Sequence, residues 1–201
     1  ADSLEGIFSH AINNEGVIRA NAVESKNGEI YLMANDRVNV AGTVSAEGGK
    51  VRVDSEGADY SGVIKAADSV FNSNGGDTFL SGSCLGGACT FNDNLNIYVT
   101  DDYTAYGNLI INADNDNNGS GEFGLSAGKN LFSSGSMLIK AGQNIAFGNN
   151  SAVSSNGPDT LTAGGDIIQG TNSSIVTKKP ASLVPGSLES TNYDPGQWYN
   201  D

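Results

Sequence analysis

A short phrase recurs along the 201-residue chain and restricts the folds that the chain can adopt. The phrase consists of a glycine, an Ile or Val with polar or spacer residues around it, and an alanine. Close copies are Gly16–Ala20, Gly42–Ala46 and Gly62–Ala66, and looser copies with two extra residues are Gly107–Ala113 and Gly135–Ala141. Successive alanines are 26, 20, 47 and 28 residues apart, and we interpret the gap of 47 as about two periods.

Between Gly16 and Gly57 the apolar residues occupy every second position, as in a strand with one buried face. These residues are Ile18, Ala20, Ile30, Leu32, Ala34, Val38, Val40, Val44, Ala46, Val51 and Val53. Strands repeated every ~20–28 residues are typical of stacked coils, in which no single repeat can bury its apolar face alone. The sequence therefore predicts an all-β fold, a parallel β-solenoid of roughly eight coils with about three short strands in each.

Composition and charge agree with a narrow solenoid and limit its partners. Hydrophobic residues make up 38% of the chain, below the ~45–50% of ordinary globular domains, and 27 glycines are available for corners. The formal net charge is −13, so nucleic acid and anionic membranes are poor partners, because phosphate binding needs clustered Lys and Arg. The sequence contains no apolar run of ~20 residues, so we expect no membrane insertion. The acidity fits a cation binder, an extracellular protein or a merely soluble one.

The two cysteines, Cys84 and Cys89, are separated by four residues that include Gly86 and Gly87. This spacing predicts a disulfide that closes a small turn, at a corner of the solenoid or in a protrusion from it. A disulfide indicates an oxidising compartment. Free buried thiols are the alternative. Zinc is disfavoured because His10 is the only histidine and is distant in sequence.

An Asp/Asn-rich segment at residues 114–122 resembles a calcium-binding loop. Its Asp, Asn and Gly occupy the first, third, fifth and sixth positions of the D-x-[DN]-x-[DN]-G pattern, in which oxygens converge on a hard cation. The predicted ligands are Asp114, Asp116, Asn118, Ser120 and Glu122. The twelfth position is Leu125 and not the usual glutamate, so a polar turn without metal is the alternative interpretation.

A group of tyrosines is a further functional candidate. Tyr98, Tyr103 and Tyr106 lie close together in sequence, and such rings either pack in the core or stack on sugars.

The phrase A-G-x-[ND] recurs at Ala127–Asn130, Ala141–Asn144 and Ala163–Asp166, which extends the solenoid prediction into the second half. Residues 1–177 are therefore expected to form the solenoid. Residues 178–201, with three prolines, are expected to form a tail that caps it or contacts another subunit through Tyr193, Trp198 and Tyr199.

The run from Gly16 to Val53 resembles the exoproteins of bacterial two-partner secretion systems, the filamentous-haemagglutinin-like adhesins. The resemblance rests on the phrases "N-x-G-x-I-x-A", "G-x-I-x-L-x-A" and "V-x-x-x-G-x-I-x-A-x-G-G-x-V-x-V". It implies a right-handed parallel β-helix, export through an outer-membrane partner transporter, and an adhesive or filamentous role at the bacterial cell surface. The chain departs from the family in length and in lacking an Asn-Pro-Asn-Gly motif.

Two non-enzymatic functions follow, and a third is the alternative. The first is a secreted adhesin shaft that presents a surface to host cells or glycans, and the second is a filament subunit that stacks head to tail. The third is a carbohydrate-binding or polysaccharide-degrading β-helix, whose chemistry would need paired carboxylates with a charge stabiliser. Asp101 with Asp102, and Asp114 with Asp116, are the only tight acidic sets, and no acid, base and stabiliser group together around them in the sequence. We therefore expect no enzymatic activity and no catalytic residues.

Overall fold

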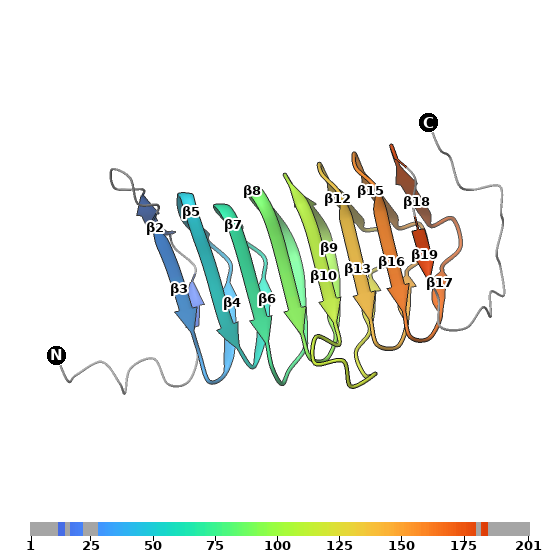
Figure 1. The fold of residues 1–201 in the computed structure, drawn as a ribbon, viewed down its shortest axis with the longest axis horizontal. Coiled ribbons are helices and arrows are strands. Elements are labelled where there is room, and N and C mark those ends of the chain that lie inside the picture. The colour runs from blue at the N-terminus through green and yellow to red at the C-terminus, as the bar shows by residue number, and fades with distance from the viewer. Residues whose placement is uncertain (1–11, 15–16, 22–27, 180–181, 185–201) are drawn as a thin grey trace.

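The computed structural model describes residues 12–14, 17–21, 28–179 and 182–184. These residues form strands and turns without any helix, so none of them belongs to a helix that could cross a membrane. Nineteen strands pair in parallel and wind into a single elongated stack, with the chain progressing from one end to the other (Figure 1). The predicted all-β parallel solenoid is confirmed.

Each turn of the chain contributes three strand segments, and equivalent segments stack to form three faces. The first face contains β1 (Ile12–Asn14), β4 (Arg37–Val40), β6 (Gly57–Tyr60), β11 (Phe123–Leu125), β14 (Ile145–Phe147) and β17 (Ile167–Gln169). The second contains β2 (Val17–Asn21), β12 (Asn130–Ser133), β15 (Ala152–Ser155) and β18 (Ser174–Thr177). The third contains β3 (Glu29–Met33), β10 (Asn108–Ala113), β13 (Met137–Ala141), β16 (Asp159–Ala163) and β19 (Ser182–Val184).

Four longer strands continue around corners. β5 (Thr43–Ser55) and β7 (Val63–Ser73) run along the second and third faces, β8 (Thr78–Asp93) along all three, and β9 (Ile97–Ala105) along the first and second. Following the pairings gives eight layers on each face, which agrees with the expected coil number and with three segments per coil. β19 lies in the predicted tail and pairs with β16, so the ladder reaches residue 184. The rest of that tail, with Tyr193, Trp198 and Tyr199, lies outside the described residues, as does His10.

The register corrects one detail of the repeat. Ala46 pairs with Ala66, and Ala113 pairs with Ala141, as the spacing predicts. In the next layer, however, Ala66 pairs with Gly86, and the register partner of Ala113 in the layer before it is Asp93. Ala66 and Ala113 are therefore in different columns, and the gap of 47 residues is not two periods. The alanines belong to two columns, on the second and third faces, because a small apolar side chain suits the inward position before either corner.

The phrase A-G-x-[ND] also occurs at two different corners. Ala141 and Ala163 are register partners that end the third face and precede the next layer. Ala127 instead lies between β11 and β12, at the corner that joins the first face to the second. The three copies are therefore not one repeat, and only the last two are structurally equivalent.

Inward side chains from the three faces fill the interior. Its centre holds a stack of four aromatic rings from the third to the fifth layer, namely Tyr60, Phe71, Phe91 and Tyr103. The Phe71 and Phe91 rings are parallel, with centroids 4.7 Å apart, and Tyr103 meets Phe91 edge-on at 5.8 Å. In the sixth and seventh layers the rings of Phe123 and Phe147 are also buried, with centroids 6.2 Å apart. The other apolar core residues are mostly aliphatic, so the core is continuous along the stack.

Inward hydroxyl groups hold the corner between the second and third faces. Ser133, Ser155 and Thr177 are register partners in successive layers. Ser133 donates to the Gly107 carbonyl at 2.7 Å, and both Ser155 and Thr177 donate to that of Gly157, at 2.7 and 2.6 Å. These bonds give the buried hydroxyl groups acceptors in the corner backbone.

Glycines at this same corner allow the chain to pass very close to the layer below. A Cβ atom on Gly107 would lie 1.5 Å from the carbonyl oxygen of Gly87, and one on Gly135 would lie 2.9 Å from the Gly107 carbonyl carbon. The amide of Gly135 donates to the Gly107 carbonyl at 3.0 Å, and that of Gly157 to the Gly135 carbonyl at 2.8 Å. Backbone stacks directly on backbone here, so no side chain fits.

Candidate functional site

The outer side of the first face carries a hydrogen-bonded column of polar side chains. Its members immediately precede the first inward residue of the fourth to eighth layers and are Asp77, Asn96, Glu122, Asn144 and Asp166. Asn96 donates to the Asp77 carboxylate at 2.9 Å, and Asn144 to that of Glu122 at 3.1 Å. Backbone amides of Glu122 and Asp166 donate to the side-chain Oδ1 atoms of Asn96 and Asn144, at 2.8 and 2.9 Å. We call this set the polar column.

A second column lies beside it, two residues further along each strand, and therefore also points outward. Its members are Asp59, Phe79, Tyr98, Gly124, Ala146 and Ile168, which are register partners in successive layers. The rings of Phe79 and Tyr98 stack with centroids 5.8 Å apart and an interplanar angle of 23°. We call this set the ring column, because two adjacent aromatic rings are its largest members.

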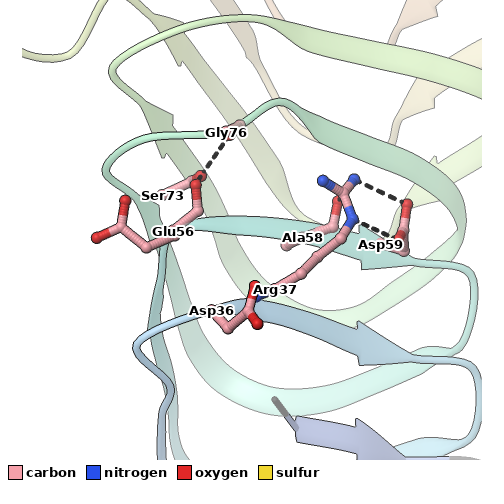
Figure 2. Close-up of polar contacts among 7 residues, drawn as sticks. All are labelled: Asp36, Arg37, Glu56, Ala58, Asp59, Ser73 and Gly76. Atoms are coloured by element: carbon pink, nitrogen blue, oxygen red, sulfur yellow. Dashed lines mark hydrogen bonds and ion pairs between the residues drawn. The ribbon is translucent and has the colours of Figure 1, made fainter. Parts of the chain in front are cut away.

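Arg37 pairs with Asp59, the first member of the ring column (Figure 2). Its guanidinium carbon lies 4.9 Å from the centroid of the Phe79 ring, and its Nε donates to Asp59 Oδ2 at 2.7 Å. A second nitrogen donates to Asp59 Oδ1 and to the Ala58 carbonyl, both at 3.1 Å. The hydrogen bond to Asp59 raises the pKa of Arg37. One face of Phe79 is therefore occupied by Arg37 and the other by Tyr98.

The turn between β7 and β8 is stabilised by its own hydrogen bonds, one of which is drawn in Figure 2. The Ser73 hydroxyl donates to the Gly76 carbonyl at 2.8 Å and is 3.1 Å from the Glu56 carbonyl. Asp36 accepts the backbone amide of Arg37 at 2.8 Å, which fixes the start of β4. The acidic side chains at this end of the face thus belong to turns and ion pairs.

A recess follows Tyr98, where the ring column changes from large to small residues. Its volume is about 300 Å³, and its lining includes Tyr98, Gly124, Ser126, Ala127, Ala146 and Gly148. A Cβ on Gly124 would lie 2.8 Å from Cδ1 of the Tyr98 ring, so the ring leans over that glycine. Ile168, 46% exposed, marks the far side of the two small residues in the same column.

The electrostatics of the recess are set by the neighbouring polar column. Burial raises the pKa of the Tyr98 phenol, and the carboxylates of Asp77 and Glu122 raise it further. Because an ordinary tyrosine already titrates near ~10, the Tyr98 hydroxyl stays protonated at neutral pH. It therefore remains a hydrogen-bond donor at the edge of an acidic surface.

The cysteines lie in the core and not on a protrusion. Cys84 and Cys89 are 1% and 2% exposed, on the second and third faces of the β8 layer, and their Cα atoms are 6.5 Å apart. They are at disulfide distance, and the pair links two faces across the corner formed by Gly86 and Gly87. The corner interpretation is confirmed, and the protrusion is wrong because these glycines pack on Ala66 and Ala67.

The loop predicted to bind calcium extends from the stack between β10 and β11. It contains nine residues, 114–122, where the equivalent connections at 94–96 and 142–144 contain three. Its side-chain oxygens take part in local hydrogen bonds: Asp114 accepts the Gly119 amide at 3.1 Å, and Asn118 accepts that of Ser120 at 2.7 Å. Among the described residues no three His, Cys, Asp or Glu side chains form a metal-binding group. Calcium binding by Asp114, Asp116, Asn118, Ser120 and Glu122 stays a prediction.

The remaining predicted candidates are separated by the fold. Tyr98 points outward, Tyr103 is 2% exposed in the core, and Tyr106 is 57% exposed after the end of β9, so the three tyrosines form no cluster. Asp101 pairs with Lys129 at 2.8 Å, and Asp102 accepts the Asn130 amide at 2.8 Å. The two carboxylates thus tie the fifth layer to the sixth.

Gly124, Ala146 and the polar column were not identified from the sequence. The sequence signal for the polar column was weak. It consisted of an Asn, Asp or Glu before the first inward residue of a first-face strand, at spacings that vary with coil length. No family model, curated protein or solved structure matches the chain, so its surface is interpreted from its own geometry.

Proposed function

We propose that the chain is a secreted, non-enzymatic structural and adhesive β-solenoid of the bacterial cell surface. The observation that carries this proposal is the unbroken parallel pairing of three faces through eight layers. Such a ladder uses inward side chains and the backbone for cohesion, which makes a stiff rod whose outward residues are available for contacts. A shaft that presents a binding surface needs this division of roles.

Two further observations support an extracellular shaft. The cysteine pair lies at disulfide distance in the core, which suits folding in an oxidising compartment. The repeats of the first layers resemble those of filamentous-haemagglutinin-like exoproteins, so export through an outer-membrane partner transporter is part of the proposal. The outward aromatic and amide groups of the first face provide a surface for host cells or glycans.

Cell binding tests the adhesive role directly. Fluorescently labelled protein is incubated with epithelial cells over a concentration series, with heat-unfolded protein as the control. Saturable binding of the folded protein is expected. Binding that neither saturates nor exceeds that of the unfolded control contradicts the adhesive role.

A second candidate is a filament subunit whose stack ends meet head to tail. Five of the seven exposed large hydrophobic residues described lie in the two terminal layers, namely Tyr31, Met33, Ile168, Val176 and Val184. Outward residues of a terminal layer have a neighbouring layer on one side only, so end-to-end stacking would cover these apolar groups. Electron microscopy at increasing protein concentration tests this candidate, and particles that stay single at every concentration exclude it.

A further inference from the structure

We propose that the recess beside Tyr98 binds a neutral saccharide chain along the first face. This inference rests on the proposed adhesive function and assigns that function a site and a ligand class. The recess is shallow and open to solvent, with a volume of about 300 Å³, which suits a chain that lies along the surface better than an enclosed ligand. It is lined by an aromatic ring, by small residues and by the backbone of the turns after β11 and β14.

The shape of the recess follows from the order of residues in the ring column. Tyr98, Gly124, Ala146 and Ile168 are consecutive register partners, so one large residue stands at each end of two small ones. Paired strands are ~4.8 Å apart, which places the Tyr98 and Ile168 layers about 14 Å from each other. The recess itself extends from Tyr98 to the layer of Ala146, and Ile168 stands one layer beyond its lining. A saccharide chain in the recess would therefore run from Tyr98 toward Ile168 along the ring column.

The chemistry of the two columns matches the two kinds of surface on a sugar ring. A pyranose has C–H groups on its faces and hydroxyl groups around its rim. The C–H groups pack against an aromatic ring such as Tyr98, while rim hydroxyls need side chains that can both donate and accept hydrogen bonds. Asn96, Glu122 and Asn144 point outward in the same layers as Tyr98, Gly124 and Ala146. They do not line the recess, which extends from the ring column in the other direction, to Ser126, Ala127 and Gly148. A sugar on the ring column would reach them with rim hydroxyls on the side away from that lining.

The polar column retains hydrogen-bonding capacity. The amide nitrogen of Asn144 carries two protons, and one of them is directed to Glu122 Oε1 at 3.1 Å. Each carboxylate oxygen accepts more than one hydrogen bond, so Glu122 can accept a sugar hydroxyl and keep Asn144. The column is also held in place by backbone amides, which reduces the entropy lost on binding.

Charge selects a neutral ligand. The polar column contains the carboxylates of Asp77, Glu122 and Asp166, and the whole chain has a formal charge of −13. The nearest cations on this face and its turn, Arg37 and Lys129, are paired with Asp59 and Asp101. An anionic polysaccharide would meet net repulsion along the ring column.

Isothermal titration calorimetry with defined oligosaccharides tests the proposal. The probes are cellohexaose, maltohexaose and N-acetylated chitohexaose, with oligogalacturonate of matched length as the anionic comparison. Two variants alter the recess: Tyr98→Ala removes the ring and Ala146→Leu fills the floor. The matched controls are Tyr106→Ala, an exposed tyrosine elsewhere, and Ser154→Leu, an outward residue of the same layer on the second face.

We expect wild-type protein to bind at least one neutral hexasaccharide. Tyr98→Ala and Ala146→Leu should each lower its affinity at least about 10-fold, while the two controls stay within about 2-fold. Binding of no neutral probe, equal binding by all variants, or tighter binding of oligogalacturonate overturns the proposal. A thermal melt of each variant shows whether it is folded. If Tyr98→Ala does not fold, Ala146→Leu alone provides the test.

The cell-binding assay, repeated with these variants, separates this inference from the proposed function. If wild-type protein and Ala146→Leu bind cells equally, the recess is not the adhesive site but the adhesive function stands. If the hexasaccharide binds as expected and cells are not bound, the site stands and the adhesive function fails.

Discussion

Asp93 places a carboxyl group in the interior of the stack. It is fully buried at the end of the β8 segment on the third face, between Ser73 and Ala113 in register. Its Oδ1 accepts the Leu95 amide at 2.8 Å, but its Oδ2 has no hydrogen-bond partner among the described residues. Burial raises the pKa of Asp93 to about 6, although the hydrogen bond from the Leu95 amide offsets part of the rise.

The raised pKa of Asp93 predicts that stability falls as pH rises. Between the unfolded pKa of ~3.9 and the folded value of about 6, the folded chain binds a proton that the unfolded chain has lost. This contribution to stability is therefore complete below pH ~4 and lost above pH ~6. Asp93→Asn should raise the free energy of unfolding at pH 7 by about 3 kcal/mol and change it little at pH 4. Urea unfolding at both pH values measures this.

The control for this prediction is Asp68→Asn, on the outer side of β7. It removes a carboxylate from the surface and not from the interior, so it should change the free energy of unfolding little. An Asp93→Asn protein that keeps the wild-type pH dependence would show that another group is responsible.

At the scale of a single corner, close backbone contact decides which residues are accepted. Gly107→Ala would bring a Cβ within 1.5 Å of the Gly87 carbonyl oxygen, and the backbone would have to move. We expect it to lower the free energy of unfolding by about 1–3 kcal/mol, measured by urea denaturation. Gly124→Ala is the control, since the atom it meets at 2.8 Å belongs to the Tyr98 ring, which can rotate. Equal losses in both variants would contradict the argument.

The loop at residues 114–122 is expected to be dispensable for folding. Replacing it by Gly-Gln-Asn, the sequence of residues 142–144, restores the three-residue connection used one layer later and places an Asn at the polar-column position of Glu122. Because loop closure depends weakly on loop length, Tm should change by less than about 3 °C. A Tm loss well beyond that would show that the loop supports the stack.

The same pair of proteins tests calcium. The calcium hypothesis requires added calcium to raise the Tm of the wild-type protein and to leave the shortened variant unchanged, since a ligand stabilises only the state that binds it. Equal effects on both proteins would exclude the loop as the site.

The sequence predicted where the strands lie better than it predicted which residues stack on one another in successive layers. Alternating residues and corner glycines define strands locally, so the three-stranded coils could be predicted. Which residues stack on one another depends on the number of residues in each coil, and this number varies. Register partners are 20 residues apart at Val63 and Ser83 but 22 apart at Leu131 and Val153. The assignment of Ala66 and Ala113 to one column failed for this reason. The recess could not be predicted because Gly124 and Ala146 form it only by stacking beside Tyr98.

At the scale of the whole molecule, each layer contacts only its neighbours, so stability is expected to vary along the rod. The aromatic stack of Tyr60, Phe71, Phe91 and Tyr103 lies in the third to fifth layers, while β17, β18 and β19 form the eighth layer, with a paired layer on one side among the described residues. Backbone amides should exchange most slowly around Phe91 and fastest in the terminal layers.

Two substitutions distinguish this graded rod from a uniformly cooperative domain. Phe91→Ala removes a fully buried ring from the central stack, so it should cost about 3–5 kcal/mol and speed hydrogen exchange most in the central layers, where exchange is otherwise slowest. Ile175→Ala, in the eighth layer, should speed exchange in β17–β19 and leave β6–β10 unchanged, because those strands share no contact with it. Hydrogen exchange followed by mass spectrometry resolves the layers. If Ile175→Ala speeds exchange at Phe91 as much as at β18, the layers do not open independently.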